Sequence, residues 1–415
     1  MKSALRMRAR KRFSQTCQRR DFKRLNAKPK VAVVHPGLGF GGSEAATLWT
    51  IEALKRDYDV TFISLIGVDL ERLNAYYGTA LAPADFSFQR ASLPVGLRNT
   101  AKFDALKGRF LLRYVRRAAP EFDVLISCYG PMDFGQPGLQ MLADFSFVDE
   151  WRMELHPTFR TWKAWFYGDT LVRRAYMRLC DAIARINPQA WGQNVTLANS
   201  AWSAERMQKK FGMAARTLYP PVEGGYPEVP FAEREPGFVC LGRVSPEKCT
   251  HSVIEILRQV RARGQAVHLH IVGLIDDSAY GNKVRRLAEQ HRDWVHLEGL
   301  VFGNRKKQIL STHRFGINGC ASEAFGIAVA EMVLAGCIVF VPKGGGQVEI
   351  VSDPALVFEN ESDAASKVAA VLANAAEQER LRRHLRQGSG QFSAEGFQSQ
   401  VQEVVKDFLK ERSKA

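Results

Sequence analysis

Short apolar runs alternate with amphipathic stretches along almost the whole chain from residue 30 onwards. The runs are rich in valine, isoleucine and leucine and show little apolar–polar alternation, which is typical of strands buried on both faces of a parallel sheet. The expected strands are 31–34, 60–65, 123–128 and 195–200 in the first half, and 238–242, 267–273, 295–299, 315–319 and 337–341 in the second.

Between these runs, apolar residues recur at helical spacing. The expected helices are 43–56 and 103–118 in the first half, and 251–263, 282–291, 306–311 and 326–335 in the second. Ser43 is the expected N-cap of the first of these helices, because its hydroxyl can accept a first-turn amide. Strands that alternate with helices predict parallel βαβ units.

One segment interrupts the alternation. Residues 219–237 contain five prolines and three glycines, a composition that marks a linker. We therefore expect an α/β protein of two facing Rossmann-like, doubly wound domains, 30–220 and 221–391, with a ligand cleft where the carboxyl ends of the two sheets meet. Residues 392–415 form an amphipathic helix that we expect to pack back on the first domain.

Charge is concentrated at the start of the chain. The net charge is +15, and residues 1–30 carry twelve lysines and arginines against one aspartate. The basic tail, 1–29, is open to three interpretations: a solvated disordered arm, an arm attracted to anionic lipid, or an organelle transit peptide. Nucleic acid is not an expected partner, since the tail contains only phenylalanine among the aromatic types and no recognised motif.

Cysteine usage and hydropathy indicate the compartment. The seven cysteines are odd in number and contain no C-x-x-C pair, which favours reduced thiols in the cytoplasm. No apolar run approaches the roughly 18 residues that a membrane span needs. We expect a cytoplasmic protein, peripheral at the inner face of the membrane if it binds one.

A glycine-rich loop follows the first expected strand. Gly37, Gly39 and Gly42 have the spacing G-x-G-x-x-G, which allows backbone amides to approach a phosphate. A dinucleotide fingerprint also needs a carboxylate at the end of the second strand, but the next one is Asp69, in the following loop. An NAD-dependent oxidoreductase that uses loop 37–42 is therefore an alternative with an incomplete motif, and a turn without a ligand is another.

The second half brings charged residues and glycines to successive strand ends. Glu323 and Glu331 flank seven residues around the start of a helix, where first-turn amides form an anion site. The amides expected there belong to Ala324, Phe325, Gly326 and Ile327. Arg243 and Lys248 follow another strand and could neutralise a diphosphate.

These segments resemble the family 4 glycosyltransferases of the GT-B fold. The resemblance is carried by GFGGSE at 39–44, GRVSPEK at 242–248, SEAFGIAVAE at 322–331 and GGGQVEIV at 344–351. ANSAW at 198–202 and YPPV at 219–222 further resemble the mannosyltransferases of lipid-linked oligosaccharide synthesis, which use GDP-mannose.

The resemblance implies a retaining, metal-independent transfer of a hexose, with mannose favoured, from a nucleoside-diphosphate sugar to a saccharide or lipid-linked acceptor. It implies that the domain 30–220 lies on the acceptor side and that the domain 221–391 binds the donor nucleotide. Arg243 and Lys248 would hold the donor diphosphate, Glu323 the sugar and Glu331 the ribose, while the amides of 324–327 meet the sugar or phosphate. Gly41 and Gly42 would approach from the opposite lobe. No separate cofactor is required, and no D-x-D-like metal pair is found.

Two segments carry the remaining expectations. Asp144 occupies the position at which many relatives place a histidine, so it could contact the sugar or the acceptor, or cap a loop. Residues 151–178 interleave aromatic and basic side chains, which suits either a helical pair packed on the first domain or a face on an anionic membrane. A sugar-nucleotide epimerase and a nucleotide-binding regulatory protein with a decayed site are the other function classes considered, and the four intact charged residues argue against decay.

Overall fold

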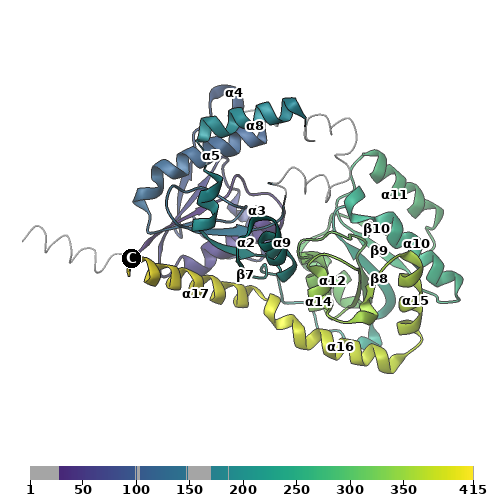
Figure 1. The fold of residues 1–415 in the computed structure, drawn as a ribbon. Coiled ribbons are helices and arrows are strands. Elements are labelled where there is room, and N and C mark those ends of the chain that lie inside the picture. The colour runs from purple at the N-terminus through teal and green to yellow at the C-terminus, as the bar shows by residue number, and fades with distance from the viewer. Residues whose placement is uncertain are drawn as a thin grey trace, which may run out of the picture.

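The computed structural model describes residues 28–98, 100, 103–145, 147, 170–185 and 187–414, which form two α/β lobes (Figure 1). Residues 1–27 of the basic tail and 151–169 of the aromatic and basic stretch lie outside the described residues. Two facing doubly wound domains, the predicted fold class, are confirmed.

The first lobe contains a parallel sheet of seven strands in the order β3-β2-β1-β4-β5-β6-β7. Both faces are covered: Val31 and Val33 of β1 point into one apolar cluster, and Ala32 and Val34 into another. This double burial explains why the strand sequence lacks polar alternation. The strands are β1 (Lys30–Val34), β2 (Asp59–Ser64), β3 (Ser87–Arg90), β4 (Val124–Ser127), β5 (Leu139–Leu142), β6 (Val195–Ala198) and β7 (Ala215–Thr217).

Helices cover both faces of this sheet. They are α2 (Gly42–Leu54), α3 (Leu70–Tyr77), α4 (Val95–Arg98), α5 (Asp104–Ala118), α8 (Leu171–Ala184) and α9 (Ala201–Phe211). The predicted N-cap of the first helix is wrong. Gly41 occupies that position, and Ser43 lies inside the first turn with its hydroxyl bonded to Glu44.

The second lobe has a six-stranded parallel sheet in the order β10-β9-β8-β11-β12-β13, with one continuous apolar core. Its strands are β8 (Glu235–Leu241), β9 (Leu269–Val272), β10 (Val295–Gly299), β11 (His313–Ile317), β12 (Ile338–Pro342) and β13 (Val357–Phe358). Its helices are α10 (Thr250–Ala262), α11 (Ala279–Gln290), α12 (Gly303–Thr312), α13 (Ile327–Leu334), α14 (Gln347–Val351), α15 (Glu361–Leu372) and α16 (Ala375–Ser389).

The last helix, α17 (Ala394–Arg412), leaves the second lobe and runs along the first, as the yellow helix of Figure 1 shows. Its apolar positions are buried in the first lobe's core with α2. These positions are Phe397, Val401, Val404, Val405 and Phe408. The Gln402 amide also donates to the Ala53 carbonyl at 2.8 Å. Within the described part of the chain, none of the helices has the length and apolarity to cross a bilayer.

Candidate functional site

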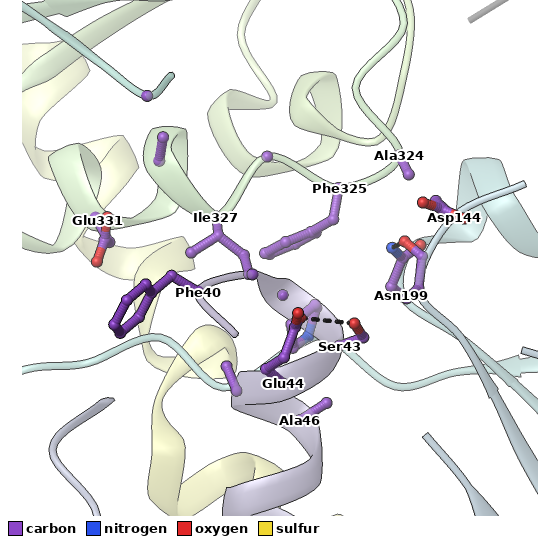
Figure 2. Close-up of a pocket in the computed structure, with 18 of the residues that line it drawn as sticks. Phe40, Ser43, Glu44, Ala46, Asp144, Asn199, Ala324, Phe325, Ile327 and Glu331 are labelled. Atoms are coloured by element: carbon purple, nitrogen blue, oxygen red, sulfur yellow. Dashed lines mark hydrogen bonds between the residues drawn. The ribbon is translucent and has the colours of Figure 1, made fainter. Parts of the chain in front are cut away.

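A deep cleft separates the lobes where the carboxyl ends of both sheets face each other. It encloses a cavity of about 840 Å³, and residues from both lobes line it (Figure 2). The loops after β1, β5 and β6 form one wall, and the loops after β8, β9 and β11 form the other. All residues that the sequence analysis selected for the site line this cavity: Gly41, Gly42, Asp144, Arg243, Lys248, Glu323, Ala324, Phe325, Gly326, Ile327 and Glu331.

The helix start in the second-lobe wall is shifted from its predicted position. Helix α13 begins at Ile327, and Gly326 is its N-cap with φ 106°, a conformation that favours glycine. The first-turn amides are therefore those of 326–329, and Ala324 and Phe325 lie in the loop just before the helix instead of in its first turn. The Phe325 ring packs against both Tyr219 and Phe392.

One ion pair joins the two strand-end loops of the second lobe. The Lys248 ammonium donates to the Glu323 carboxylate, and 27% and 21% of the two side chains are exposed. Burial disfavours the charge on Lys248, but the Glu323 carboxylate outweighs it and raises the pKa of Lys248. Burial likewise opposes the charge on Glu323, but the attraction of the Lys248 ammonium is stronger than this effect and lowers the pKa of Glu323. Both groups therefore remain charged through the neutral range.

Arg243 follows the same strand as Lys248 but has a different environment. Its side chain is 68% exposed, and its guanidinium lies 3.8 Å from the Glu247 carboxylate. An exposed pair of this kind holds a side chain weakly. Arg243 is consequently able to reorient toward a ligand in the cavity.

A second ion pair, which the sequence analysis missed, holds Glu331. The Lys306 ammonium, on α12, lies 2.7 Å from the Glu331 carboxylate and 3.8 Å from that of Glu223. Burial opposes the charge on Lys306, but Glu331 and its neighbours raise the pKa of Lys306. No sequence signal distinguishes Lys306 from its neighbour Lys307, because only the packing of α12 against the cleft places Lys306 beside Glu331 while Lys307 pairs with Glu223 at 2.8 Å.

Backbone hydrogen bonds to a tyrosine hydroxyl hold the glycine loop of the first-lobe wall. The Gly41 amide donates to the Tyr77 hydroxyl at 2.6 Å, and that hydroxyl lies 3.0 Å from the Gly39 carbonyl. A Cβ on Gly42 would lie 2.9 Å from Cδ1 of Ile327, so glycine here lets the two walls approach closely. Tyr77 also lay outside the sequence prediction.

A buried histidine supports this glycine loop. Ser43 donates its one hydroxyl proton to Glu44 at 2.7 Å, so the Nε2 of His35, 3.1 Å from the Ser43 oxygen, must be the donor to it. The Gly37 amide donates to Nδ1 of the same ring at 3.2 Å. Burial lowers the pKa of His35 to about 4, against the raising effect of Glu44. The ring is therefore neutral at pH 7 and fixes the loop without adding positive charge.

Asp144 follows β5 and lines the first-lobe side of the cavity. Figure 2 shows it beside Asn199, opposite Ala324 of the second lobe. The Asn199 amide donates to the Ala143 carbonyl at 2.6 Å, which ties the loops after β5 and β6 together. A carboxylate in this position can accept hydrogen bonds from hydroxyl groups of a bound ligand.

Direct hydrogen bonds connect the two lobes at the base of the cleft. The Glu349 carboxylate of α14 accepts the amides of Ala201 and Trp202, the first turn of α9, at 2.9 and 2.7 Å. The Ser200 hydroxyl donates to the Ala324 carbonyl at 2.6 Å. A second-lobe carboxylate thus caps a first-lobe helix, which fixes the distance between the walls.

The structure removes the support for a dinucleotide at loop 37–42. Strand β2 ends at Ser64, whose hydroxyl donates to the Pro36 carbonyl at 3.1 Å. The next carboxylate, Asp69, is the N-cap of α3 and accepts the Arg72 amide at 3.2 Å. The residue that would have to bind a ribose is thus used as a helix cap.

Comparison with known proteins agrees with this geometry. Residues 227–388 match the sequence model of the family described as "Glycosyl transferases group 1", so the second lobe is a glycosyltransferase group 1 domain. The chain is 27% identical over 235 residues to the GDP-Man:Man(3)GlcNAc(2)-PP-Dol alpha-1,2-mannosyltransferase of Homo sapiens, and 28% identical over 178 residues to the protein of that name from Yarrowia lipolytica. These matches cover 49% and 37% of this chain but 46% and 28% of the two proteins, so the chain spans less than half of each.

Solved structures share the complete architecture. WaaG, a glycosyltransferase involved in lipopolysaccharide biosynthesis, superimposes with a TM-score of 0.63 at 15% identity, covering 90% of this chain and 99% of that one. HepE of Anabaena, solved in complex with UDP-glucose, gives 0.64 at 14% identity, covering 91% and 100%. At these identities the likeness establishes the fold, with both lobes included.

Proposed function

We propose that this protein, whose second lobe is a glycosyltransferase group 1 domain within a GT-B fold, transfers a hexosyl group from a nucleoside-diphosphate sugar to a saccharide or lipid-linked acceptor. Mannose, carried by GDP, is the favoured sugar. The proposal draws on the curated relatives, which are named as GDP-mannose-dependent mannosyltransferases. HepE, a structural neighbour, is described in complex with UDP-glucose.

The observation that carries the proposal is the charge arrangement of the second-lobe wall. Lys248 and Arg243 lie on one loop, Glu323 on another, and the first-turn amides of α13 lie just beyond Glu323. Two cations next to a helix N-terminus can stabilise a diphosphate and the charge that develops on it as it leaves. Glu331, inside the same helix, is placed to accept hydrogen bonds from ribose hydroxyls.

In the proposed reaction the sugar lies between the lobes. Glu323 holds the donor sugar, the amides of 324–327 meet the sugar or its phosphate, and the glycine loop at Gly41 and Gly42 closes on it from the first lobe. The bond from the anomeric carbon to the donor phosphate breaks, and the acceptor hydroxyl attacks from the same face. The leaving phosphate takes the acceptor proton, so configuration is retained without a protein nucleophile. Lys248 and Arg243 offset the charge of the leaving diphosphate, a role that requires no bound metal.

The acceptor is proposed to enter along the first lobe, where this lobe would rest on the anionic inner face of a membrane. Figure 1 shows α4, α5 and α8 together at one end of this lobe. Exposed apolar side chains gather there: Val95, Phe103, Leu171, Val172 and Leu179. Exposed arginines accompany them at 113, 117, 174 and 178. Apolar groups with adjacent cations suit the boundary between lipid tails and phosphates.

A donor screen tests the leading claim. Binding of the correct nucleotide sugar raises the melting temperature by mass action, so GDP-mannose should raise it more than UDP- or ADP-sugars do. Transfer is then measured with radiolabelled donor, with and without a lipid-linked saccharide. Release of an epimerised sugar nucleotide without any acceptor would favour the epimerase instead. Stimulation of transfer by added Mg²⁺ or Mn²⁺ would contradict metal independence.

Vesicle sedimentation tests the membrane surface. The protein should pellet with anionic vesicles, less at high salt and less again when Arg113 and Arg117 are changed to glutamate. Arg292→Glu, an exposed charge reversal on the second lobe, is the matched control and should pellet like the wild type. Equal pelleting with neutral and anionic vesicles would refute this part of the proposal.

A further inference from the structure

Three imidazole rings meet near the amino ends of the strands of the second sheet, on the side away from the cleft. His268 precedes β9, His270 lies within β9, and His313 is the first residue of β11. One ring nitrogen from each histidine lies within 4.8 Å of the corresponding nitrogens of the other two. The ring centroids of His270 and His313 are 4.6 Å apart. Nothing in the proposed transfer reaction uses this cluster.

The tautomers of two of these rings can be deduced. Nδ1 of His313 lies 2.7 Å from the Ile309 carbonyl, which can only accept, so the proton is on Nδ1 and the lone pair on Nε2. Nδ1 of His270 lies 2.7 Å from the Glu298 carboxylate, which fixes that ring in the same tautomer. A carboxylate or carbonyl that orients an imidazole in this way is the usual second partner of a metal-bound histidine.

The free nitrogens are otherwise unexplained. His313 is 3% exposed, and its buried Nε2 has no hydrogen-bond partner among the described residues. The Nε2 of His268 also lacks one, although the Glu235 carboxylate lies 3.3 Å away without hydrogen-bond geometry. Orphaned buried polar atoms are costly and require a partner. Two of them in one cluster point to a group that binds both.

The sheet is shaped to bring these rings together. Strand β8 runs between β9 and β11, so side chains from the two outer strands must meet over it. Residue 237 of β8 is glycine, and a Cβ there would overlap with the His268 ring. The missing side chain leaves the space in which the histidines converge.

The charge state favours metal binding. Burial lowers the pKa of His268, His270 and His313, so all three rings are neutral and basic at pH 7, the form that ligates metals. The titratable and charged groups near them are Glu235, Glu298, His296, Arg261 and, 3.2 Å beyond Glu298, Arg305. A carboxylate oxygen or water can complete four-coordination.

We propose that His268, His270 and His313 form a binding site for one divalent transition-metal ion, zinc in the first place, that ties β9 to β11 across β8. Three imidazole nitrogens suit zinc in tetrahedral coordination, whereas magnesium and calcium require oxygen ligands. The site is a structural one, remote from the cleft and independent of the proposed transfer reaction.

Direct metal binding tests the site. The full chain, free of any histidine tag and freed of metal with a chelator, is titrated with Zn²⁺ against a chromophoric competitor. We expect one equivalent to bind and to raise the melting temperature. Co²⁺ in place of zinc should give the visible bands of tetrahedral nitrogen and oxygen ligation without a thiolate charge-transfer band. Failure of the wild type to bind one equivalent, or the presence of the thiolate band, would overturn the proposal.

Variants then locate the ion. His313→Ala and His270→Ala should each weaken binding at least about 100-fold, since loss of an outer-shell partner alone costs about 10- to 100-fold. His251→Ala is the matched control: this half-buried histidine of the same lobe bonds Tyr280 at 2.9 Å and should bind zinc like the wild type. Equal affinity in His313→Ala and His251→Ala would refute the assignment.

A milder variant covers the case in which the histidine variants do not fold, as judged by circular dichroism. Glu298→Gln keeps the side-chain volume but weakens the acceptor that orients His270. It should bind zinc about 10- to 100-fold more weakly. Unchanged affinity in this variant would contradict the proposed site.

Discussion

The two walls of the cleft differ in the cations they carry, although carboxylates line both. The cations among the described residues that line the cavity are Arg243, Lys248 and Lys306, and all three belong to the second lobe. The first-lobe wall offers the carboxylates Glu44 and Asp144 together with glycine backbone. Anion affinity is therefore confined to one wall, while the other suits hydroxyl groups, which donate to carboxylates.

The cations of the second-lobe wall are also already paired. Lys248 pairs with Glu323, and Lys306 pairs with Glu331. A diphosphate must compete for Lys248, so its binding is weaker than the bare charges suggest, but the pairs keep each side chain in position. Substitutions on the two walls should therefore differ in how far they lower kcat and nucleotide affinity.

The largest effect is expected for Lys248→Ala. It removes a cation from the leaving diphosphate and leaves Glu323 without its counter-charge, so we expect kcat to fall about 10²- to 10³-fold. Steady-state transfer assays measure it. Lys343→Ala, an exposed lysine of the same lobe that pairs with Glu359, is the control and should be unchanged. A Lys248→Ala enzyme with normal kcat would show that the charge asymmetry has no role in the reaction.

Glu331→Gln tests the ribose role on the same wall. Hydrogen bonds to a charged acceptor are worth about 1.5–3 kcal/mol, so nucleotide affinity should fall roughly 10- to 100-fold. Calorimetric titration with the nucleoside diphosphate measures it. Glu359→Gln, an exposed carboxylate of the second lobe, should bind the nucleotide normally. Unchanged affinity in Glu331→Gln would remove the ribose assignment.

Gly346→Ala acts where the walls touch. Its backbone conformation is ordinary, but a Cβ would overlap with the Ala324 carbonyl and lie 2.6 Å from Cβ of Ser200, across the lobes. We expect a loss of about 1–3 kcal/mol in the free energy of unfolding, measured in urea. Gly388→Ala, on α16 with open space around it, is the control and should gain about 0.5–1 kcal/mol. Equal stability of both variants would mean that the walls are not in firm contact.

The smallest expected effect belongs to the first-lobe wall. Asp144→Asn should leave nucleotide affinity unchanged and lower kcat/KM for transfer about tenfold, the equivalent of one hydrogen bond of about 1.4 kcal/mol. Assays of binding and transfer on the same preparation separate the two. A loss of nucleotide affinity equal to that in Glu331→Gln would show that anion affinity is not confined to the second lobe.

Much of the site follows from local sequence. Each strand end is marked by a buried apolar run, and the carboxyl ends of parallel strands necessarily share one edge. The strand pattern alone therefore predicts that Arg243, Lys248 and Glu323 lie together. The expected helix start was too early by a few residues, because it depends on the dihedral angles of one glycine, Gly326, so Ala324 and Phe325 precede the first turn.

Other contacts had no signal in the local sequence. Lys306 reaches Glu331, and Glu349 caps a helix of the other lobe, only because separate segments pack together. The histidine cluster likewise joins two strands that are not neighbours in the sequence or in the sheet. Helical spacing and motif spacing describe one segment at a time, so contacts of this kind lie beyond them.

The sequence was enough to predict two α/β domains and the strand ends that bear charge, because hydrophobic periodicity and glycine placement act over a few neighbouring residues. The pairing of each lysine with its glutamate, the close approach of the walls and the meeting of the imidazoles are visible in the folded protein alone. Those outcomes depend on the packing of helices and sheets across large separations in the chain, which local patterns do not encode.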